Sequence, residues 1–155
     1  MDIVYLQKEI YLEDAGTHRD IYVLNTTKDD WKKWVDIVNE RYGVEFFNGQ
    51  TQTTENKINF QAILDFWMGK TDLINGAKIK LNGIDIHCHF FSDQEIENDV
   101  DPSQIKTIDD HNELMDYLRT VSTGLDKRVI LTPENSQEIV LIECEKGQIA
   151  VSPTG

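Results

Sequence analysis

The stretch AKIKLNGIDIHCHFF, residues 77–91, contains two segments in which apolar and polar residues alternate, one on each side of Asn82-Gly83. Asn-Gly readily adopts the positive backbone angles of a tight hairpin turn, and alternation is typical of a half-buried strand. The stretch therefore predicts a β-hairpin. Because successive side chains of a strand point to opposite faces, the second strand should present two sets of residues. One set is Ile84, Ile86, Cys88 and Phe90, and the other is Asp85, His87, His89 and Phe91.

Three segments outside the hairpin have the apolar spacing and the end signals of helices. Two of them begin with a threonine three positions before an aspartate, Asp30 in one and Asp110 in the other, and all three contain a glycine at or near their end. The tryptophans lie on the apolar faces of these segments, which predicts that they pack in the core. The predicted helices are TTKDDWKKWVDIVNERYG (26–43), NKINFQAILDFWMGK (56–70) and TIDDHNELMDYLRTVSTG (107–124).

The remaining alternating segments predict strands, and the polar segments between them predict loops. Two predicted loops are QTQTTEN (50–56) and the acidic segment SDQEIENDVDPSQ (92–104). Because strands and helices interleave irregularly, the sequence predicts a single α+β domain over residues 1–155, with about three helices packed on an antiparallel or mixed sheet. The predicted strands are IVYLQ (3–7), EIYLE (9–13), RDIYVLNT (19–26), VEFFNG (44–49), RVILTP (128–133), EIVLIECE (138–145) and GQIAVS (147–152).

The composition is strongly acidic, with 28 Asp and Glu against 15 Lys and Arg and a net charge of −13. Nucleic acid is then a poor ligand, whereas a basic protein would be attracted. Neither a signal peptide nor a membrane span is expected, and Cys88 and Cys144 are interpreted as reduced thiols, so the sequence predicts a cytoplasmic protein. It contains no phosphate loop, GxSxG or HExxH motif, and we expect no cofactor.

A metal site is the main enzymatic alternative. Asp85, His87 and His89 should share one face of a strand, and His-x-His pairs do bind metals. A metal held by His87 and His89, helped by Asp85 or His111, would suit a small hydrolase that activates water on the metal. Catalytic zinc sites usually have three protein ligands, however, and no third ligand follows from this spacing. We therefore expect the two histidines to be structural residues on the wetter face of a strand.

The acidic residues are concentrated in one part of the chain. The 24 residues from Asp93 to Asp116 carry nine acids and one lysine, a net charge of −8 (9 − 1 = 8). The spacing fails as an EF-hand, because it lacks the required glycine and the final glutamate. The cluster is then either a solvated surface, as in a regulatory domain whose acidity only keeps it soluble, or an interface for a basic protein. The candidate partner-binding residues are Asp93, Glu95, Glu97, Asp99, Asp101, Asp109, Asp110 and Glu113.

The strand RDIYVLNT followed by TTKDDWKKWVDIV, together with the small size and acidity of the chain, resembles the immunity proteins that bacteria pair with contact-dependent or polymorphic toxins. The resemblance covers residues 19–42 and includes no diagnostic motif. It implies a non-enzymatic inhibitor that binds a cognate toxin domain, often a nuclease with a basic cleft. It carries over no catalytic residue and no contact position.

Overall fold

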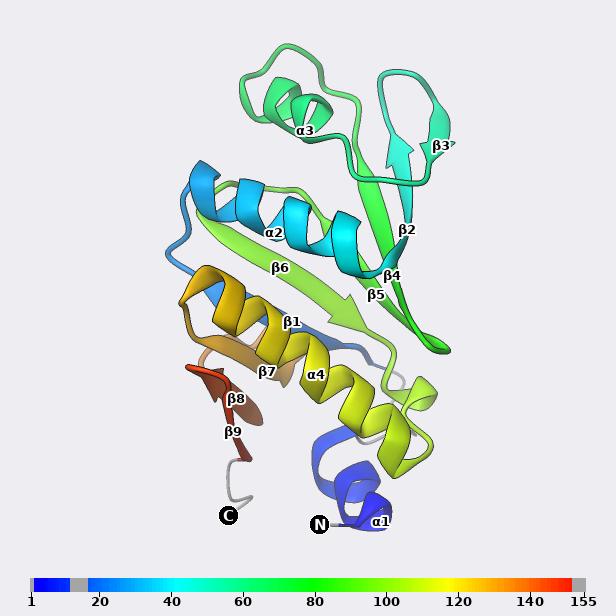
Figure 1. Ribbon diagram of the computed structural model, residues 1–155, viewed down its shortest axis with the longest axis vertical. Coiled ribbons are helices and arrows are strands. Elements are labelled where there is room, and N and C mark those ends of the chain that lie inside the picture. Colours follow the sequence, from blue (N-terminus) through cyan, green and yellow to red (C-terminus); the bar gives the residue numbers. More distant parts are fainter. Residues whose placement is uncertain (1, 12–16, 152–155) are drawn as a thin grey trace.

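The computed structural model describes residues 2–11 and 17–151 and has an α+β architecture (Figure 1). The nine strands formed by the described residues belong to one antiparallel sheet, whose order is β3-β2-β4-β5-β6-β1-β7-β8-β9. The sequence left open whether the sheet is mixed or antiparallel, and it is antiparallel. The strands are β1 Arg19–Leu24, β2 Gly43–Asn48, β3 Thr53–Glu55, β4 Gly76–Leu81, β5 Ile84–His89, β6 Glu95–Val100, β7 Val129–Pro133, β8 Ile142–Glu145 and β9 Gln148–Val151.

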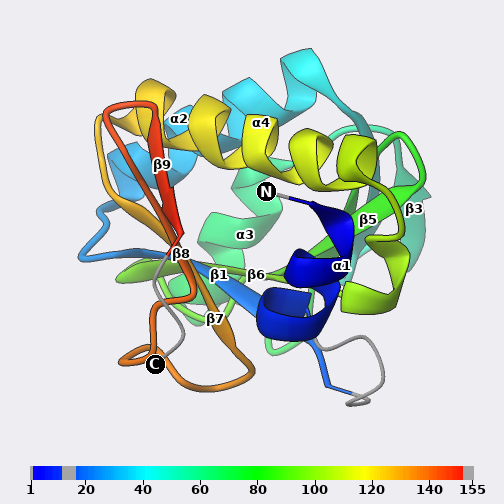
Figure 2. The same cartoon turned by 90° about the horizontal axis from the view of Figure 1, so that it is seen from below.

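Helices cover one face of this sheet. The two longest, α2 and α4, lie side by side across it (Figures 1 and 2). Within residues 2–11 and 17–151, no helix is both long and apolar enough to cross a membrane. The helices are α1 Ile3–Leu6, α2 Lys28–Arg41, α3 Phe60–Trp67 and α4 Ile108–Leu125, with a π-helical turn η1 at Gln7–Tyr11 and a 3-10 turn η2 at Pro102–Gln104.

The caps of the two long helices confirm the sequence prediction. Thr27 accepts a hydrogen bond from the backbone of Asp30, whose side chain bonds back to the Thr27 backbone, and Thr107 forms the same box with Asp110. Such boxes satisfy backbone N–H groups that have no partner inside the helix. The prediction that α4 stops at Gly124 is short by one residue, since the helix ends at Leu125.

The hairpin of residues 77–91 also forms as predicted. Asn82 and Gly83 take φ values of 46° and 92°, as a tight turn of this kind requires. β4 and β5 pair in register from Gly76 opposite His89 to Leu81 opposite Ile84. The predicted inward set of β5 is buried, and its polar set lies on the other face.

The predicted opening strands, 3–7 and 9–13, are wrong where the structure describes them. Residues 3–11 are helical, and Asp2 caps the first turn by accepting a hydrogen bond from the backbone N of Tyr5 at 2.9 Å. The buried residues Leu6 and Ile10 are four positions apart, which is the spacing of one helix face. Residues 12 and 13 of the second predicted strand lie outside the described residues.

The acidic segment 92–104 is a second error, because much of it is strand β6 rather than loop. This strand lies in the middle of the sheet, between β5 and β1. Its charged residues alternate with the buried side chains of Ile96, Asn98 and Val100. Two smaller differences are the short strand β3 inside the predicted loop 50–56 and the later start of β8, at Ile142 rather than residue 138.

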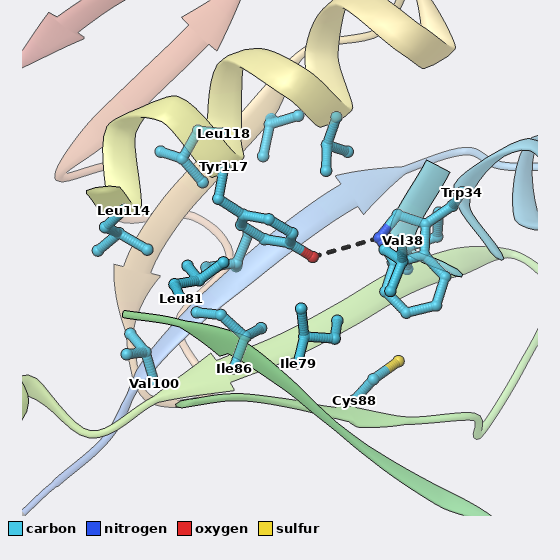
Figure 3. Close-up of a cluster of buried hydrophobic side chains, with 14 of the residues drawn as sticks. Trp34, Val38, Ile79, Leu81, Ile86, Cys88, Val100, Leu114, Tyr117 and Leu118 are labelled. Carbon is cyan, nitrogen blue, oxygen red and sulfur yellow. Dashed lines mark hydrogen bonds between the residues drawn. The ribbon is translucent and has the colours of Figure 1, made fainter. Parts of the chain in front are cut away.

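The core lies between the sheet and the helices and contains one chain of polar contacts. Trp34 in α2 donates its indole N–H to the Tyr117 hydroxyl of α4 at 3.2 Å (Figure 3), and that hydroxyl donates to the Asn98 side chain in β6. Trp31 packs edge-on against Trp34, with ring centroids 5.5 Å apart. The predicted packing role of the tryptophans is confirmed for these two, which are fully buried, and Trp67 is half-buried against Trp31. Both cysteines are free and buried.

Candidate binding face

The second face of the sheet presents polar and aromatic side chains, and we call it the open face. Strand alternation identifies it: Ile21 and Val23 of β1 belong to the hydrophobic core, whereas Tyr22 between them does not. The same alternation in β7 sends Ile130 to the open face. By this alternation the main open-face residues are Asp20 and Tyr22 on β1, Glu45 and Phe47 on β2, Lys78 and Lys80 on β4, Asp85, His87 and His89 on β5, and Glu95, Glu97 and Asp99 on β6.

Four carboxylates gather on β1 and β6, and we call them the acid cluster: Asp20, Glu95, Glu97 and Asp99. Asp99 lies directly opposite Asp20 in the register of the two strands. Like charges in directly opposite positions destabilise a sheet. Within residues 2–11 and 17–151, no lysine or arginine lies within ion-pair distance of these four carboxylates. The sheet thus places negative charges together without pairing them with Lys or Arg.

The protonation equilibria of the cluster reflect this crowding. Burial raises the pKa of Asp20, and the charges of Asp99 and Glu134 add to the rise, although hydrogen bonds from the Asn135 backbone and the Tyr22 hydroxyl oppose it. Burial also raises the pKa of Glu97, and the nearby charges of Asp20 and Glu95 raise it further. Both carboxyl groups hold their protons more tightly than in water, because burial removes water from the charged forms and neighbouring carboxylates repel them.

His89 is the cationic group closest to the cluster. Its Nε2 lies 2.9 Å from Oδ2 of Asp99, and this hydrogen bond raises the pKa of His89 against the opposing effect of partial burial. The ring of His89 also stacks on Phe91, with centroids 5.4 Å apart and an angle of 16° between the rings. Phe91 is 64% exposed, so the stacked rings of His89 and Phe91 offer an aromatic surface that is accessible to solvent.

Replacing Asp99 with asparagine should lower the pKa of His89 toward its ordinary value. Because the pKa of His89 is higher in the folded state, its protonated form stabilises the fold. This contribution is complete at pH values below the unfolded-state pKa of 6.5 and is lost as the pH rises through the folded-state pKa. The stability of wild type relative to Asp99→Asn should therefore decrease from pH 6 to pH 9. Urea unfolding and NMR titration of the histidines would measure both effects. His111, whose pKa burial lowers, serves as the unaffected control; an unchanged His89 pKa in the variant would contradict the pairing.

The connection between β7 and β8, residues 134–141, turns back over part of the cluster. The backbone N of Asn135 donates to Asp20 at 2.7 Å, and the side chain of Gln137 donates to Glu95 at 2.5 Å. Asp20 is therefore only 3% exposed, whereas Glu95, Glu97 and Asp99 remain partly accessible. The accessible part of the acid cluster lies along β6.

The other predicted partner-binding residues are distributed elsewhere. Asp93 precedes β6, and its carbonyl accepts a hydrogen bond from Thr26 at 2.6 Å. Asp101 caps η2 by accepting a hydrogen bond from the backbone of Ser103 at 2.9 Å. The remaining three lie in the first turns of α4, on the helical side of the sheet: Asp109, Asp110, which forms the capping box, and Glu113. The structure brings Glu95, Glu97 and Asp99 together and separates them from the α4 acids.

The residues of the predicted metal alternative are only partly brought together. Asp85, His87 and His89 share the open face, as predicted. His111 lies on α4, across the sheet, where Nδ1 is 2.6 Å from the hydroxyl of Tyr11. In the parts of the chain that the structure describes, no three His, Cys, Asp or Glu residues are grouped so that they could hold a metal ion.

Sequence reasoning missed two contributors to the open face. Asp20 joins the cluster through the pairing of β1 with β6, although the alternation of RDIYVLNT already placed it on one face with Tyr22. Gly76 lies between Phe47 on β2 and His89 on β5, so no side chain fills the position between them. Its signal was available in the hairpin register, because Gly76 begins β4 directly opposite the end of β5.

No protein-family model matches the chain, and no match is found among curated proteins or solved structures. The inference about function therefore rests on the molecule itself. Its fold and open face define an antiparallel α+β domain with helices on one side of the sheet and an acidic, partly aromatic surface on the other.

Proposed function

We propose that this protein is a non-enzymatic binding protein that recognises a basic protein through the open face of its sheet. More specifically, the protein is an immunity-type inhibitor that neutralises a cognate basic toxin domain, for example a nuclease. The observation that supports it is the acid cluster, which has no lysine or arginine partner within the described residues.

The position of these acids favours an interface over simple solvation. Carboxylates that serve only solubility can be spread over a surface, where they repel one another weakly. Here Asp99 faces Asp20 across neighbouring strands, and the pKa of Glu97 is raised by burial and by its acidic neighbours. A Lys or Arg side chain from a partner would compensate the accessible charges of this cluster, which lie along β6, and stabilise the complex.

The open face also has the composition of an interface. Interfaces are enriched in aromatic residues, and Phe47 and Phe91 are 41% and 64% exposed on or beside this face. Complementary charge would accelerate encounter with a basic cleft, and aromatic contacts would then slow dissociation. An inhibitor of this kind needs no catalytic group and acts by covering the partner's active surface.

Co-expression with a neighbouring toxin tests the proposal. Where the host genome places a gene with a variable C-terminal toxin domain beside this one, that domain is expressed alone and together with this protein. We expect the domain alone to stop growth, and co-expression to restore growth through a stoichiometric complex. Absence of both protection and complex formation would refute the inhibitor proposal, and a location among metabolic genes would favour an enzyme.

A further inference from the structure

Gly76 leaves a hollow of about 260 Å³ on the open face. It lies in one row of the sheet between Phe47 and His89, which are its direct partners on β2 and β5. A Cβ atom placed at Gly76 would have no heavy atom of the surroundings within 4 Å. The side chains around it include Glu45, Phe47, Thr54, Lys78, His87 and His89.

The width of this hollow suits a flat side chain. Neighbouring strands are about 4.8 Å apart, so Phe47 and His89 stand about 10 Å apart across the glycine. A planar ring inserted between them would have a ring on each side at stacking or edge contact distance. We call this space the Gly76 slot.

The charges around the slot are asymmetric. On the β2 and β4 side, Glu45 lies 2.9 Å from Lys80 and 3.9 Å from Lys78, so two lysines share one carboxylate and this side carries no excess negative charge. On the β6 side, Glu97 lies directly opposite His89, and Asp99 bonds to that histidine. A partner group beyond His89 therefore meets Glu97, which pairs with no lysine or arginine of the described residues, and Asp99, whose charged partner there is His89.

We propose that the Gly76 slot receives an aromatic side chain of the basic protein partner, with an arginine or lysine of that partner reaching past His89 to Glu97 and Asp99. This inference rests on the proposed function, since it assigns the docking point of the same partner. The occupant is a protein segment that combines a flat ring with adjacent positive charge, which matches the rings of Phe47 and His89 on either side of the slot and the acid cluster beside it. Trp, Tyr and Arg dominate the binding energy of many interfaces when they fill such central pockets.

A glycine-to-valine replacement tests the slot without damaging the sheet. Gly76→Val places in the hollow a side chain that strands favour, at a position where an added Cβ meets no heavy atom within 4 Å, so we expect the melting temperature to stay the same or rise. Gly43→Val is the matched control: Gly43 begins β2 on the same face, and an added Cβ would make only ordinary contacts with Lys80 at 3.9 Å. The two variants carry the same chemical change at two places on one face.

The probe is a short synthetic peptide, blocked at both ends, with one tryptophan flanked by arginines. Two control peptides replace the tryptophan with alanine or the arginines with glutamates. Binding to the full chain is followed by backbone amide shifts in NMR titrations. We expect the tryptophan peptide to shift the Gly76, Phe47 and His89 signals, and the alanine peptide and the Gly76→Val variant each to weaken binding at least about tenfold. Gly43→Val should bind like wild type.

The possible results separate the slot from the proposed function. Equal binding of the tryptophan and alanine peptides, equal binding by wild type and Gly76→Val, or no shifts at all in these residues would overturn the slot while leaving the toxin co-expression test to decide the function. Equal binding of the glutamate peptide would contradict the charge recognition on which both proposals depend.

Discussion

Replacing Trp34 with alanine is expected to lower the free energy of unfolding by about 3–5 kcal/mol, the range for truncating a large aromatic side chain in a core. Trp34 is fully buried, and its ring contacts those of Trp31 and Phe90 at centroid distances of 5.5 and 6.3 Å. The replacement leaves a cavity and removes the donor to Tyr117. Urea or thermal unfolding followed by circular dichroism would measure the loss.

Trp34→Phe provides the matched control. Phenylalanine keeps an aromatic ring beside Trp31 but cannot donate to Tyr117, so the loss should be close to that of one hydrogen bond and a smaller cavity, about 1–2 kcal/mol. If the alanine variant unfolds like wild type and instead loses binding to the toxin domain, then Trp34 belongs to an interface, and its assignment to the core is wrong.

The hairpin and the long helices could be predicted because their signals are local. Asn82-Gly83 favours positive φ values wherever it occurs, and the capping boxes at Thr27 and Thr107 lie within four residues of sequence. Such features depend little on the rest of the chain. The two faces of β5 followed from the same alternation.

The N-terminal helix could not be distinguished from a strand in this way. Short apolar runs fit either periodicity, and distant contacts determine the outcome. The side chain of Gln7 donates to the carbonyl of Ile105 at 3.3 Å, and the Tyr11 hydroxyl bonds to His111, 100 residues away. The helical segment 3–11 thus packs against the start of α4 and the residues before it.

Strand β6 was hidden by its composition. Its inward positions are Ile96, Asn98 and Val100, and the polar residue in the middle makes the segment resemble a solvated loop. The Tyr117 hydroxyl satisfies the side-chain oxygen of Asn98 in the core, although the side-chain nitrogen has no hydrogen-bond partner among the described residues. Since Tyr117 lies on another element, the sequence around Asn98 contains no sign of this pairing.

The candidate site could be predicted only in part, because its residues come together through contacts between distant segments of the chain. Acidity alone identified Glu95, Glu97 and Asp99, but it grouped them with helix residues that lie on the other side of the sheet. Long-range strand pairing places Asp20 opposite Asp99 and Phe47 opposite Gly76, and no local pattern encodes these two pairings. Charge composition located the segment, and the register of the sheet determined which of its residues act together.

Reversing two charges of the acid cluster, Glu95→Lys with Glu97→Lys, should slow association with the cognate toxin domain at least about tenfold at low salt, because steering by complementary charge raises association rates by about 10 to 1,000-fold. Asp99 is left unchanged, since it pairs with His89. The melting temperature should change little: substitutions at accessible positions usually shift stability by about 0.5 kcal/mol, and relief of repulsion around Asp20 offsets part of this. Stopped-flow mixing at several salt concentrations would measure the rates.

The matched control reverses two acids of α4, Asp109→Lys with Glu113→Lys. Both double variants change the net charge from −13 to −9, because each replacement adds two positive charges. They differ in the side of the sheet that is altered. If the open face is the interface, the β6 variant should associate slowly, and its association rate should no longer depend on salt. The α4 variant should keep nearly the wild-type association rate and salt dependence, because exposed charges are screened over about 10 Å at 0.1 M salt. Equal slowing would mean that only total charge matters, and unchanged rates in both variants would show that the acids of β6 act only in solvation.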